Sequence, residues 1–403
     1  MMKDYFSAMV QGITQKLNQD PDGTHARKNY ALAIANLGEK LYTPGEKIAW
    51  CGVTAPFDLL NAMGVTSCFV EFVGATLAST DTAGLFIQEA EDAGFATDSC
   101  AYHRAVTGAL IKGALPRPDF IIGTSSPCTA GLAVMETMAR QFHKDFFVLN
   151  VPQNNTQASV DFLAGQIRDM ARFVSDHTGE SLSMEKLGTA MEKTNTMSGL
   201  LREIYAMAKS VPSPVDSRLL SDFGTVMGLL LGTDQGIRVC LAFRDELKKR
   251  LESHAMGDAR EPIRLMWIQN RIQYRFPIDR LLQDLGAKIV VDELNDVTWE
   301  PMDPDNPFES LARRIITIPY SLGTAERVRH IQDMARAYSI DGAINPCHWG
   351  CRQGTGTRGL VSRGLQEIGV PVLNLEIDCV DSRNLAQGQI QTRLEAFAEM
   401  LAR

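Results

Sequence analysis

The sequence lacks several features that would place it directly in a class of protein. No apolar run reaches the roughly 20 residues that a membrane helix needs, and the N-terminal residues lack the pattern of a secretory signal. No G-x-x-x-x-G-K-[ST] motif is present, so ATP chemistry would have to come from a partner. The net charge of −8 is opposite in sign to that of a typical nucleic-acid-binding surface. We therefore expect a cytoplasmic protein that binds neither membrane nor nucleic acid.

Cysteine is present, but without the short spacings of simple metal-binding motifs. The 403 residues include eight cysteines and no C-x-x-C pair. In a cytoplasmic chain, these are more plausible as free thiols or metal ligands than as disulfides. The hydrophobic fraction of 45% and charged fraction of 22% are those of an ordinary globular protein. One core is too small for this length, so we expect two or more domains.

Short apolar runs alternate with helical patterns in two parts of the chain. Such alternation with short links is typical of parallel-sheet α/β domains. We predict an α/β protein with two Rossmann-like or flavodoxin-like parallel-sheet domains, at residues 46–156 and 261–403. Residues 1–45 are predicted to form a helical N-terminal segment. Residues 157–260, where strand signals are scarce, are predicted to form a helical connecting segment.

Two apolar runs define predicted strand ends. Residues 65–73, rich in Val and Phe, are predicted to form one strand. Another run ends at Ile344 and is followed by a predicted turn, with a helix from about Thr357. Ligands of open α/β sheets collect where strands end and helices begin. The turn that contains His348 and Cys351 is therefore a candidate site.

Cys100, Cys128 and Cys351 each fall just before or within the first turn of a predicted helix. Free backbone N–H groups and the helix dipole stabilise a thiolate there, and the thiolate is the form that binds iron. Because two belong to the first predicted domain and one to the second, we expect them to meet between the domains. Three thiolates on a four-iron cluster would leave one iron open to a substrate oxygen, whereas a pure electron carrier normally uses four. The alternative is a set of unrelated buried thiols.

Motifs along nearly the whole chain resemble those of one enzyme family. The most specific are in the C-terminal quarter, and two others contain the first two of these cysteines. They are Asp98-Ser99-Cys100, Ser125-Ser126-Pro127-Cys128, His348-Trp349-Gly350-Cys351-Arg352-Gln353, Gly369-Val370-Pro371-Val372-Leu373, Asp378, Asp381, Arg383 and residues 388–397. They are similar to those of the 2-hydroxyacyl-CoA dehydratase and benzoyl-CoA reductase family, which includes the D-component of 2-hydroxyglutaryl-CoA dehydratase.

The resemblance implies that Cys100, Cys128 and Cys351 bind a [4Fe-4S] cluster. It also implies an acyl-CoA substrate, a paralogous second subunit and a separate ATP-dependent iron–sulfur activator that delivers a strongly reducing electron. In the dehydratases, this electron forms a ketyl radical at the thioester carbonyl. The radical expels the hydroxyl group of the adjacent carbon as water, and the electron is returned.

The resemblance leaves several alternatives open. In the reductases, low-potential electrons reduce an aromatic ring, and the form H-W-G-C-R-Q looks common among reductase-like members. A homodimer that holds a double-cubane cluster is a third possibility. A fourth is a non-catalytic supporting subunit, although all three assigned cysteines are present.

The residues around Cys351 have candidate roles of their own. His348 is the candidate catalytic residue, because it could donate a hydrogen bond to cluster sulfur or to a substrate oxygen. The alternative is a structural histidine whose ring nitrogens are hydrogen-bonded to backbone groups. Trp349 is predicted to be a packing residue that shields the cluster. Arg352 is predicted to offset the negative charge of the cluster or to bind CoA phosphate, and the alternative is a surface position. Cys347 is the one further cysteine whose position keeps a site role open.

Two other places bear on the site. The family usually has a Pro-Glu-Glu-like helix start after the first strand, and here residues 56–58 are Pro-Phe-Asp. We interpret Asp58 as a first-turn carboxylate favoured by the helix dipole. Arg271, Tyr274 and Arg275 follow a predicted strand, where ligands gather, although a solvated turn is the simpler interpretation.

Overall fold

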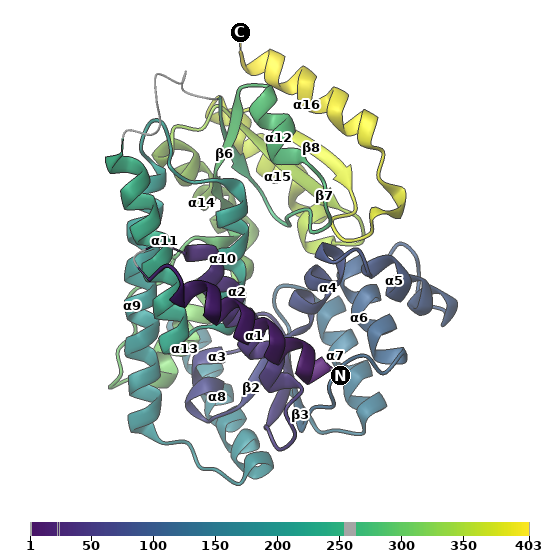
Figure 1. Cartoon of the computed structure of the whole chain (residues 1–403), viewed down its shortest axis with the longest axis vertical. Coiled ribbons are helices and arrows are strands. Elements are labelled where there is room, and N and C mark those ends of the chain that lie inside the picture. The colour runs from purple at the N-terminus through teal and green to yellow at the C-terminus, as the bar shows by residue number, and fades with distance from the viewer. Residues whose placement is uncertain (1, 22, 24, 254–262, 403) are drawn as a thin grey trace.

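Two parallel sheets form the centre of the molecule. The computed structural model describes residues 2–21, 23, 25–253 and 263–402. The sheets have the same strand order, β2-β1-β3-β4 and β6-β5-β7-β8, and every pairing in them is parallel. In Figure 1 the first sheet lies below the second, and the long helices α9 and α11 run beside both. The predicted α/β class with two parallel-sheet units is confirmed.

The strands are short and mostly buried on both faces, as expected when helices cover a parallel sheet. Those of the first sheet are β1 Ile48–Cys51, β2 Thr66–Phe69, β3 Phe120–Thr124 and β4 Phe146–Leu149. Those of the second are β5 Ile263–Trp267, β6 Ala287–Asp292, β7 Gly342–His348 and β8 Val372–Ile377.

Helices occupy most of the remaining chain. Up to the second sheet they are α1 Met2–Asn18, α2 Ala26–Leu41, α3 Phe57–Ala62, α4 Val70–Ser79, α5 Ala83–Asp92, α6 Ala101–Ile111, α7 Thr129–Phe142, α8 Gln157–Thr178, α9 Met184–Ala208, α10 Ser217–Leu229 and α11 Asp234–Glu252. Later ones are α12 Ile278–Asp284, η1 Glu293–Asn295, α13 Pro307–Thr317, η2 Pro319–Ser321, α14 Thr324–Ala337, α15 Arg352–Glu367, η3 Ser382–Asn384 and α16 Gln387–Leu401. Within the described residues, none of these helices is both long and apolar enough to traverse a bilayer.

The prediction of a strand over residues 65–73 is wrong in its second half. Parallel pairing with β1 covers only Thr66–Phe69, and the chain turns into α4 at Val70. A short run of Val and Phe cannot distinguish a buried strand from a buried helix. The prediction of a turn after Ile344 is also wrong, because β7 continues through His348, which pairs with Ile377.

Helix α15 begins at Arg352, earlier than the predicted start at about Thr357. Its first turns contain Gly354 and Gly356, and the low helix propensity of glycine concealed this start. Besides α4, two further helices were not predicted, α10 and α13. Prolines 212 and 214 obscured the first of them, although proline is tolerated just before a helix.

The two apolar cores do not follow the order of the chain. One core surrounds the first sheet and includes α8 together with Leu311 and Ile315 of α13, which comes much later in the sequence. The other surrounds the second sheet and includes Ile87 of α5 and Ala105 of α6. The boundaries at residues 45, 156 and 260 stay predictions.

A buried ion pair joins α13 to α3, the helix that follows the first strand. Asp58, in the first turn of α3, is fully buried, and its Oδ1 accepts a hydrogen bond from Arg314 Nη2 at 2.8 Å. Thr194 of α9 donates to the other carboxylate oxygen at 3.4 Å. Asp58 is thus a first-turn carboxylate as predicted, but its partner is a distant arginine inside the protein, and neither residue lines the candidate site described below.

This pair yields a stability prediction. Asp58→Ala would leave the Arg314 guanidinium buried without its counter-charge, which typically costs about 3–5 kcal/mol. The free energy of unfolding from urea denaturation should fall by that order. Asp169→Ala is the control, because the Asp169–Arg172 pair is exposed and should be worth less than about 1 kcal/mol. Equal losses in both variants would contradict this role for Asp58.

Candidate active site

A cavity of about 180 Å³ lies where the carboxyl ends of the two sheets meet. Both sheets have the flavodoxin-like order, in which ligands bind beside the first strand at the point where the strand order reverses. Segments that follow strands of both sheets contribute to it. The lining residues are Val53, Phe69, Glu71, Phe72, Ala75, Cys100, Tyr102, His103, Pro127, Cys128, Gly224, Gln269, Asn270, Arg271, Gln273, Asp292, Leu294, Asn295, Cys351 and Gln353.

Cys100, Cys128 and Cys351 all line this one cavity. They are the N-cap residues of α6, α7 and α15, so each lies at the helix end where backbone N–H groups are free. The Cys351 Sγ accepts a hydrogen bond from Gly354 N at 3.4 Å. Sequence spacing therefore placed the three thiols correctly at helix starts, and the fold brings them from distant parts of the chain to the same cavity.

The three thiols differ in their electrostatic surroundings. Burial raises the pKa of Cys100, but the charge of His103 and hydrogen bonds from His103 and His348 outweigh burial and lower this pKa to about 5. Burial raises the pKa of Cys128. Burial, together with the charge of Cys100, raises the pKa of Cys351 to about 11. Three thiolates facing one cavity would repel each other unless positive charge were placed between them.

His103 and Glu71 are site residues that the sequence analysis missed. His103 is buried on α6, and its Nε2 lies 3.2 Å from Glu71 Oε1 on α4. Burial lowers the pKa of His103, but its interactions with Cys100 and Glu71 outweigh burial and raise it well above the usual value. The C-x-x-H spacing from Cys100 at a helix start was the available signal for His103. Glu71 had none, because its segment was predicted to be a strand.

His348 lies behind Cys100 and is not among the residues that line the cavity. Its Nδ1 accepts a hydrogen bond from the backbone N–H of Cys379 at 2.9 Å, so this nitrogen carries no proton. The proton of the neutral ring is then on Nε2, which lies 3.4 Å from Cys100 Sγ and donates to it. Tyr102 packs against the ring edge to face, with 5.3 Å between ring centroids.

Segments after the second sheet supply a polar wall. Arg271 follows β5, and its Nε donates to Asp292 Oδ2 at 2.6 Å, while its guanidinium lies 5.2 Å from the Trp267 ring centroid. Of the three residues named after this strand, Arg271 lines the cavity, and its role toward a ligand stays a prediction. Tyr274 is buried away from the cavity lining, and Arg275 is exposed.

Other residues discussed from the sequence lie outside the cavity lining. The prediction that Trp349 is a packing residue is wrong, since 43% of it is exposed in the turn after β7. Arg352 is exposed, which agrees with the surface alternative. Cys347 is buried within β7 and donates toward the carbonyl oxygen of Asn345. Ser125 joins the segments after β3 and β4, because its Oγ accepts from Val151 N at 2.9 Å.

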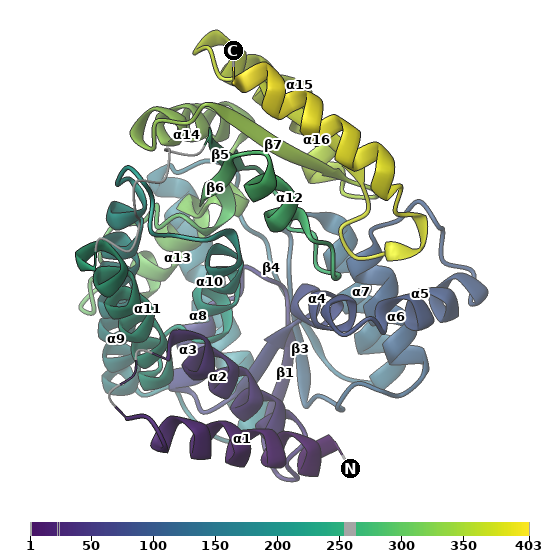
Figure 2. The ribbon, with the colours of Figure 1, turned by 45° about the horizontal axis from the view of Figure 1, so that its top comes forward.

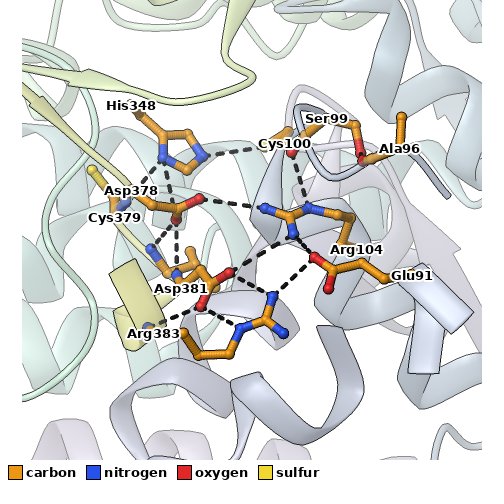
Figure 3. Close-up of polar contacts among 11 residues, drawn as sticks. Glu91, Ala96, Ser99, Cys100, Arg104, His348, Asp378, Cys379, Asp381 and Arg383 are labelled. Carbon is orange, nitrogen blue, oxygen red and sulfur yellow. Dashed lines mark hydrogen bonds and ion pairs between the residues drawn. The ribbon is translucent and has the colours of Figure 1, made fainter. Parts of the chain in front are cut away.

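An ion network beside Cys100 and His348 joins helices α5 and α6 to the loop after β8 (Figure 3). Arg104 of α6 contacts Glu91 of α5, Asp378 at 3.5 Å and Asp381 at 3.8 Å. Arg383 completes it with contacts to Asp381 at 2.8 Å and Glu91 at 2.9 Å. Figures 1 and 2 show that this loop, which precedes α16, reaches from the second sheet to α5. The family-like residues Asp378, Asp381 and Arg383 therefore connect the two parts of the molecule.

Gly350 lies against the backbone of Ser99 and Cys100 at this junction. Its φ is +76°, and a Cβ atom there would lie 2.4 Å from the backbone nitrogen of Cys100. Both the left-handed conformation and this close approach require glycine. The contact holds the chain immediately before Cys351 against the backbone of Cys100.

The donor set suits a cluster better than a single ion. Within residues 2–21, 23, 25–253 and 263–402, no three His, Cys, Asp or Glu side chains converge to hold one metal ion. A four-iron cluster is bound at its corners, so its thiolates surround a volume instead of meeting at a point. Three cysteine thiols around one cavity fit that requirement.

Fold and site together define a class of protein with two flavodoxin-like sheets and a cysteine-lined cavity between them. Comparison with known proteins identifies the family within this class. The family model described as 2-hydroxyglutaryl-CoA dehydratase, D-component, matches residues 52–401, so the chain belongs to this family.

Curated relatives agree with the family assignment. The chain is 22% identical to the (R)-phenyllactyl-CoA dehydratase alpha subunit of Clostridium sporogenes, over 89% of this chain and 90% of the relative. It is 21% identical to the lactoyl-CoA dehydratase alpha subunit of Anaerotignum propionicum, over 89% and 91%. It is 20% identical to a benzoyl-CoA reductase subunit of Thauera aromatica, over 86% and 85%. The chain is thus an enzyme subunit of the dehydratase and reductase type.

The ion network predicts an acid-dependent junction. Burial raises the pKa of Asp381, but hydrogen bonds and charge from Arg383, with the charge of Arg104, lower it below the usual value overall. A carboxyl with a lowered folded-state pKa stabilises the fold above its unfolded pKa of about 3.9, and this contribution is lost as pH falls through the folded pKa. Asp381→Asn should therefore lower the free energy of unfolding at pH 7 and reduce its dependence on pH in acid. The measurement is urea denaturation between pH 7 and pH 3.

Asp333→Asn is the control, because this exposed aspartate pairs only with Arg336 on the same helix among the described ion pairs. It should leave the acid dependence unchanged. An Asp381→Asn protein with an unaltered pH profile would contradict the prediction.

Proposed function

We propose that this chain is the [4Fe-4S]-bearing subunit of an ATP-activated acyl-CoA enzyme, with Cys100, Cys128 and Cys351 as cluster ligands. The observation that carries the proposal is the position of these three thiols, which come from three helix N-termini and line one cavity. Family membership supports the choice of cluster and substrate. When bound, the cluster would supply a low-potential electron to an acyl-CoA held beside it.

The neighbouring side chains suit this role. His348 donates from Nε2 to Cys100 Sγ and does not line the cavity, so we assign it as a positioning residue instead of a catalytic one. His103 lines the cavity beside Cys100 and adds positive charge near a cluster that carries negative charge. Both histidines would therefore stabilise the thiolate form of one ligand.

The proposal requires partners. No P-loop motif is present in the sequence, so ATP hydrolysis would belong to a separate iron–sulfur activator. The relatives are named as subunits, which supports a paralogous second subunit or a second copy of this chain. All eight cysteines are free thiols, as suits the reducing cytoplasm that we propose as its location.

Reduction of an aromatic acyl-CoA is the second candidate activity. It is favoured by the relative named as a benzoyl-CoA reductase and by Phe69 and Phe72 in the cavity wall, which would suit a ring. A double-cubane homodimer and a supporting subunit without a cluster have no observation of their own in this structure. Iron and sulfide analysis of the purified protein separates the last of these from the others.

Replacement of the cysteines tests the ligand assignment. Cys100→Ala, Cys128→Ala and Cys351→Ala should each lower the iron and sulfide content of anaerobically purified protein and change its electron paramagnetic resonance spectrum. Cys240→Ala is the matched control, because Cys240 is fully buried in α11 away from the cavity and should leave both unchanged. A protein that stays free of iron even after reconstitution would overturn the proposed function.

Replacement of His348 tests its positioning role. His348→Phe removes the donor to Cys100 Sγ, and hydrogen bonds to cluster sulfur help to set the reduction potential. We expect retained iron with a more negative potential, measured by redox titration. His348→Gln keeps an N–H donor and should recover most of the shift. Equal potentials in wild type and His348→Phe would refute the role.

A further inference from the structure

The segment that follows β5 places two consecutive amide side chains beside the start of α15. Gln269 and Asn270 both line the cavity. Gln269 is a buried non-glycine residue with a φ of +70°, in the left-handed region that few residues with a side chain adopt. Backbone conformations of this kind persist only where the surrounding structure enforces them, and they are concentrated at functional sites. We therefore asked what enforces this one and what it positions.

Buried groups on two sides fix the backbone of this segment. The N–H of Gln269 donates to Glu293 Oε2 at 3.3 Å. The carbonyl oxygen of Asn270 accepts from Trp267 Nε1 at 3.0 Å and from the Cys379 thiol at 3.8 Å. All three of these partner residues are buried. The two amide side chains therefore leave a backbone that has little freedom to move.

Asn270 directs its amide at a proposed cluster ligand. Its Nδ2 donates to Cys351 Sγ at 3.7 Å. The backbone N–H of Gly354 donates to the same sulfur at 3.4 Å, so donors reach it both from α15 and from the segment after β5. Cys100 differs, because its sulfur faces the imidazole of His348. The sulfur of Cys351 is thus supplied by neutral amide groups.

Gln269 brings a second amide to the same place. In the orientation that satisfies both ends of its carboxamide, the oxygen accepts from Arg327 Nη1 at 2.7 Å and from Nη2 at 2.5 Å. The NH₂ end then lies 2.1 Å from the position that a Cβ atom of Gly354 would take, and Cys351 Sγ lies 3.3 Å from that same position. The absence of a side chain at Gly354 therefore lets this NH₂ group approach the sulfur.

The arginine that orients Gln269 adds no net charge. Arg327 is buried and pairs with the buried Glu293 through Nε and through Nη2, the latter at 2.8 Å. Its Nη1 also donates to Thr357 Oγ1 of α15 at 2.8 Å. Because the two buried charges offset each other, the pair fixes the direction of the Gln269 amide and leaves a neutral donor at the sulfur.

We infer that Asn270 and Gln269 are positioning residues that raise the reduction potential of the cluster by donating hydrogen bonds at Cys351 Sγ. This inference rests on the proposed function, in which Cys351 is a cluster ligand. Reduction adds negative charge to the cluster and its thiolates, so a donor at the sulfur stabilises the reduced form more than the oxidised form. Removal of either amide should make the potential more negative and leave the three ligands in place.

The test is redox titration of anaerobically purified protein, with iron content and electron paramagnetic resonance spectrum recorded for each sample. Asn270→Leu and Gln269→Met each remove one donor and keep a similar side-chain volume. Each should lower the ratio of reduced to oxidised cluster at a fixed applied potential by about 3- to 10-fold. Asn270→Asp keeps the shape but replaces the donor with a negative charge, so it should cause a larger shift in the same direction.

Gln273→Met is the matched control. Gln273 also lines the cavity, but its Nε2 donates to Tyr102 OH at 3.1 Å. Tyr102 keeps its own hydrogen bond to Arg271 O at 3.3 Å in this variant. The potential should equal that of wild type. A shift as large as that of Asn270→Leu would overturn the inference, because any change of the cavity lining would then have the same effect.

The remaining outcomes separate the inference from the proposed function. A wild-type potential at full iron content in Asn270→Leu or Gln269→Met would overturn the inference for that residue and leave the proposed function standing. If Asn270→Leu alone loses its iron, Asn270→Asp decides for that residue. Loss of iron from all variants of the two amides, with wild type loaded, would overturn the inference, since they would then be needed to assemble the site. Wild type that stays free of iron after reconstitution would overturn both.

Discussion

The contact between Gly350 and the backbone of Cys100 is the constraint on which the cavity depends. It holds the start of α15 against the start of α6, and with them two of the three cavity thiols. No residue with a side chain could make this approach without displacing the chain. The ion network of Arg104 and Asp381 lies beside the same contact. Its charges are largely removed from water, and opening the junction would separate groups that now compensate one another.

The network is connected to the site through adjacent residues, so closure of the junction and orientation of the thiols are linked. Arg104 contacts Asp378, and the backbone N–H of the next residue, Cys379, fixes the tautomer of His348. His348 in turn donates to Cys100 Sγ. A displacement of the loop after β8 would therefore reach a candidate cluster ligand through two hydrogen bonds. This explains in physical terms why Asp378 and Asp381 accompany the cysteine motifs although neither lines the cavity.

Local signals in the sequence were sufficient for the sheets and for the three cysteines at helix starts. The alternation of apolar runs and helical patterns identified both parallel sheets, because the strands are short and most of their residues are buried. These signals failed where a buried strand and a buried helix have the same composition. This is the case at Val70, where one apolar run changes from strand to helix. That error concealed Glu71. Arg271 appeared only as a strand-end candidate, since its pairing with Asp292 depends on how β5 and β6 lie side by side. Partners this far apart in sequence leave no periodic pattern from which to predict them.

The two sheets have the same strand order but supply different chemistry to the cavity. The parts of the chain around the first sheet contribute Cys100, Cys128, His103 and Glu71, whereas those of the second contribute Cys351, Arg271 and a series of amides. A group that bound all three cysteines would span both parts. Neither part alone contains a complete site. The packing of one sheet's loops against the other's is therefore a requirement of the proposed chemistry, and the buried charges at the junction hold those loops together.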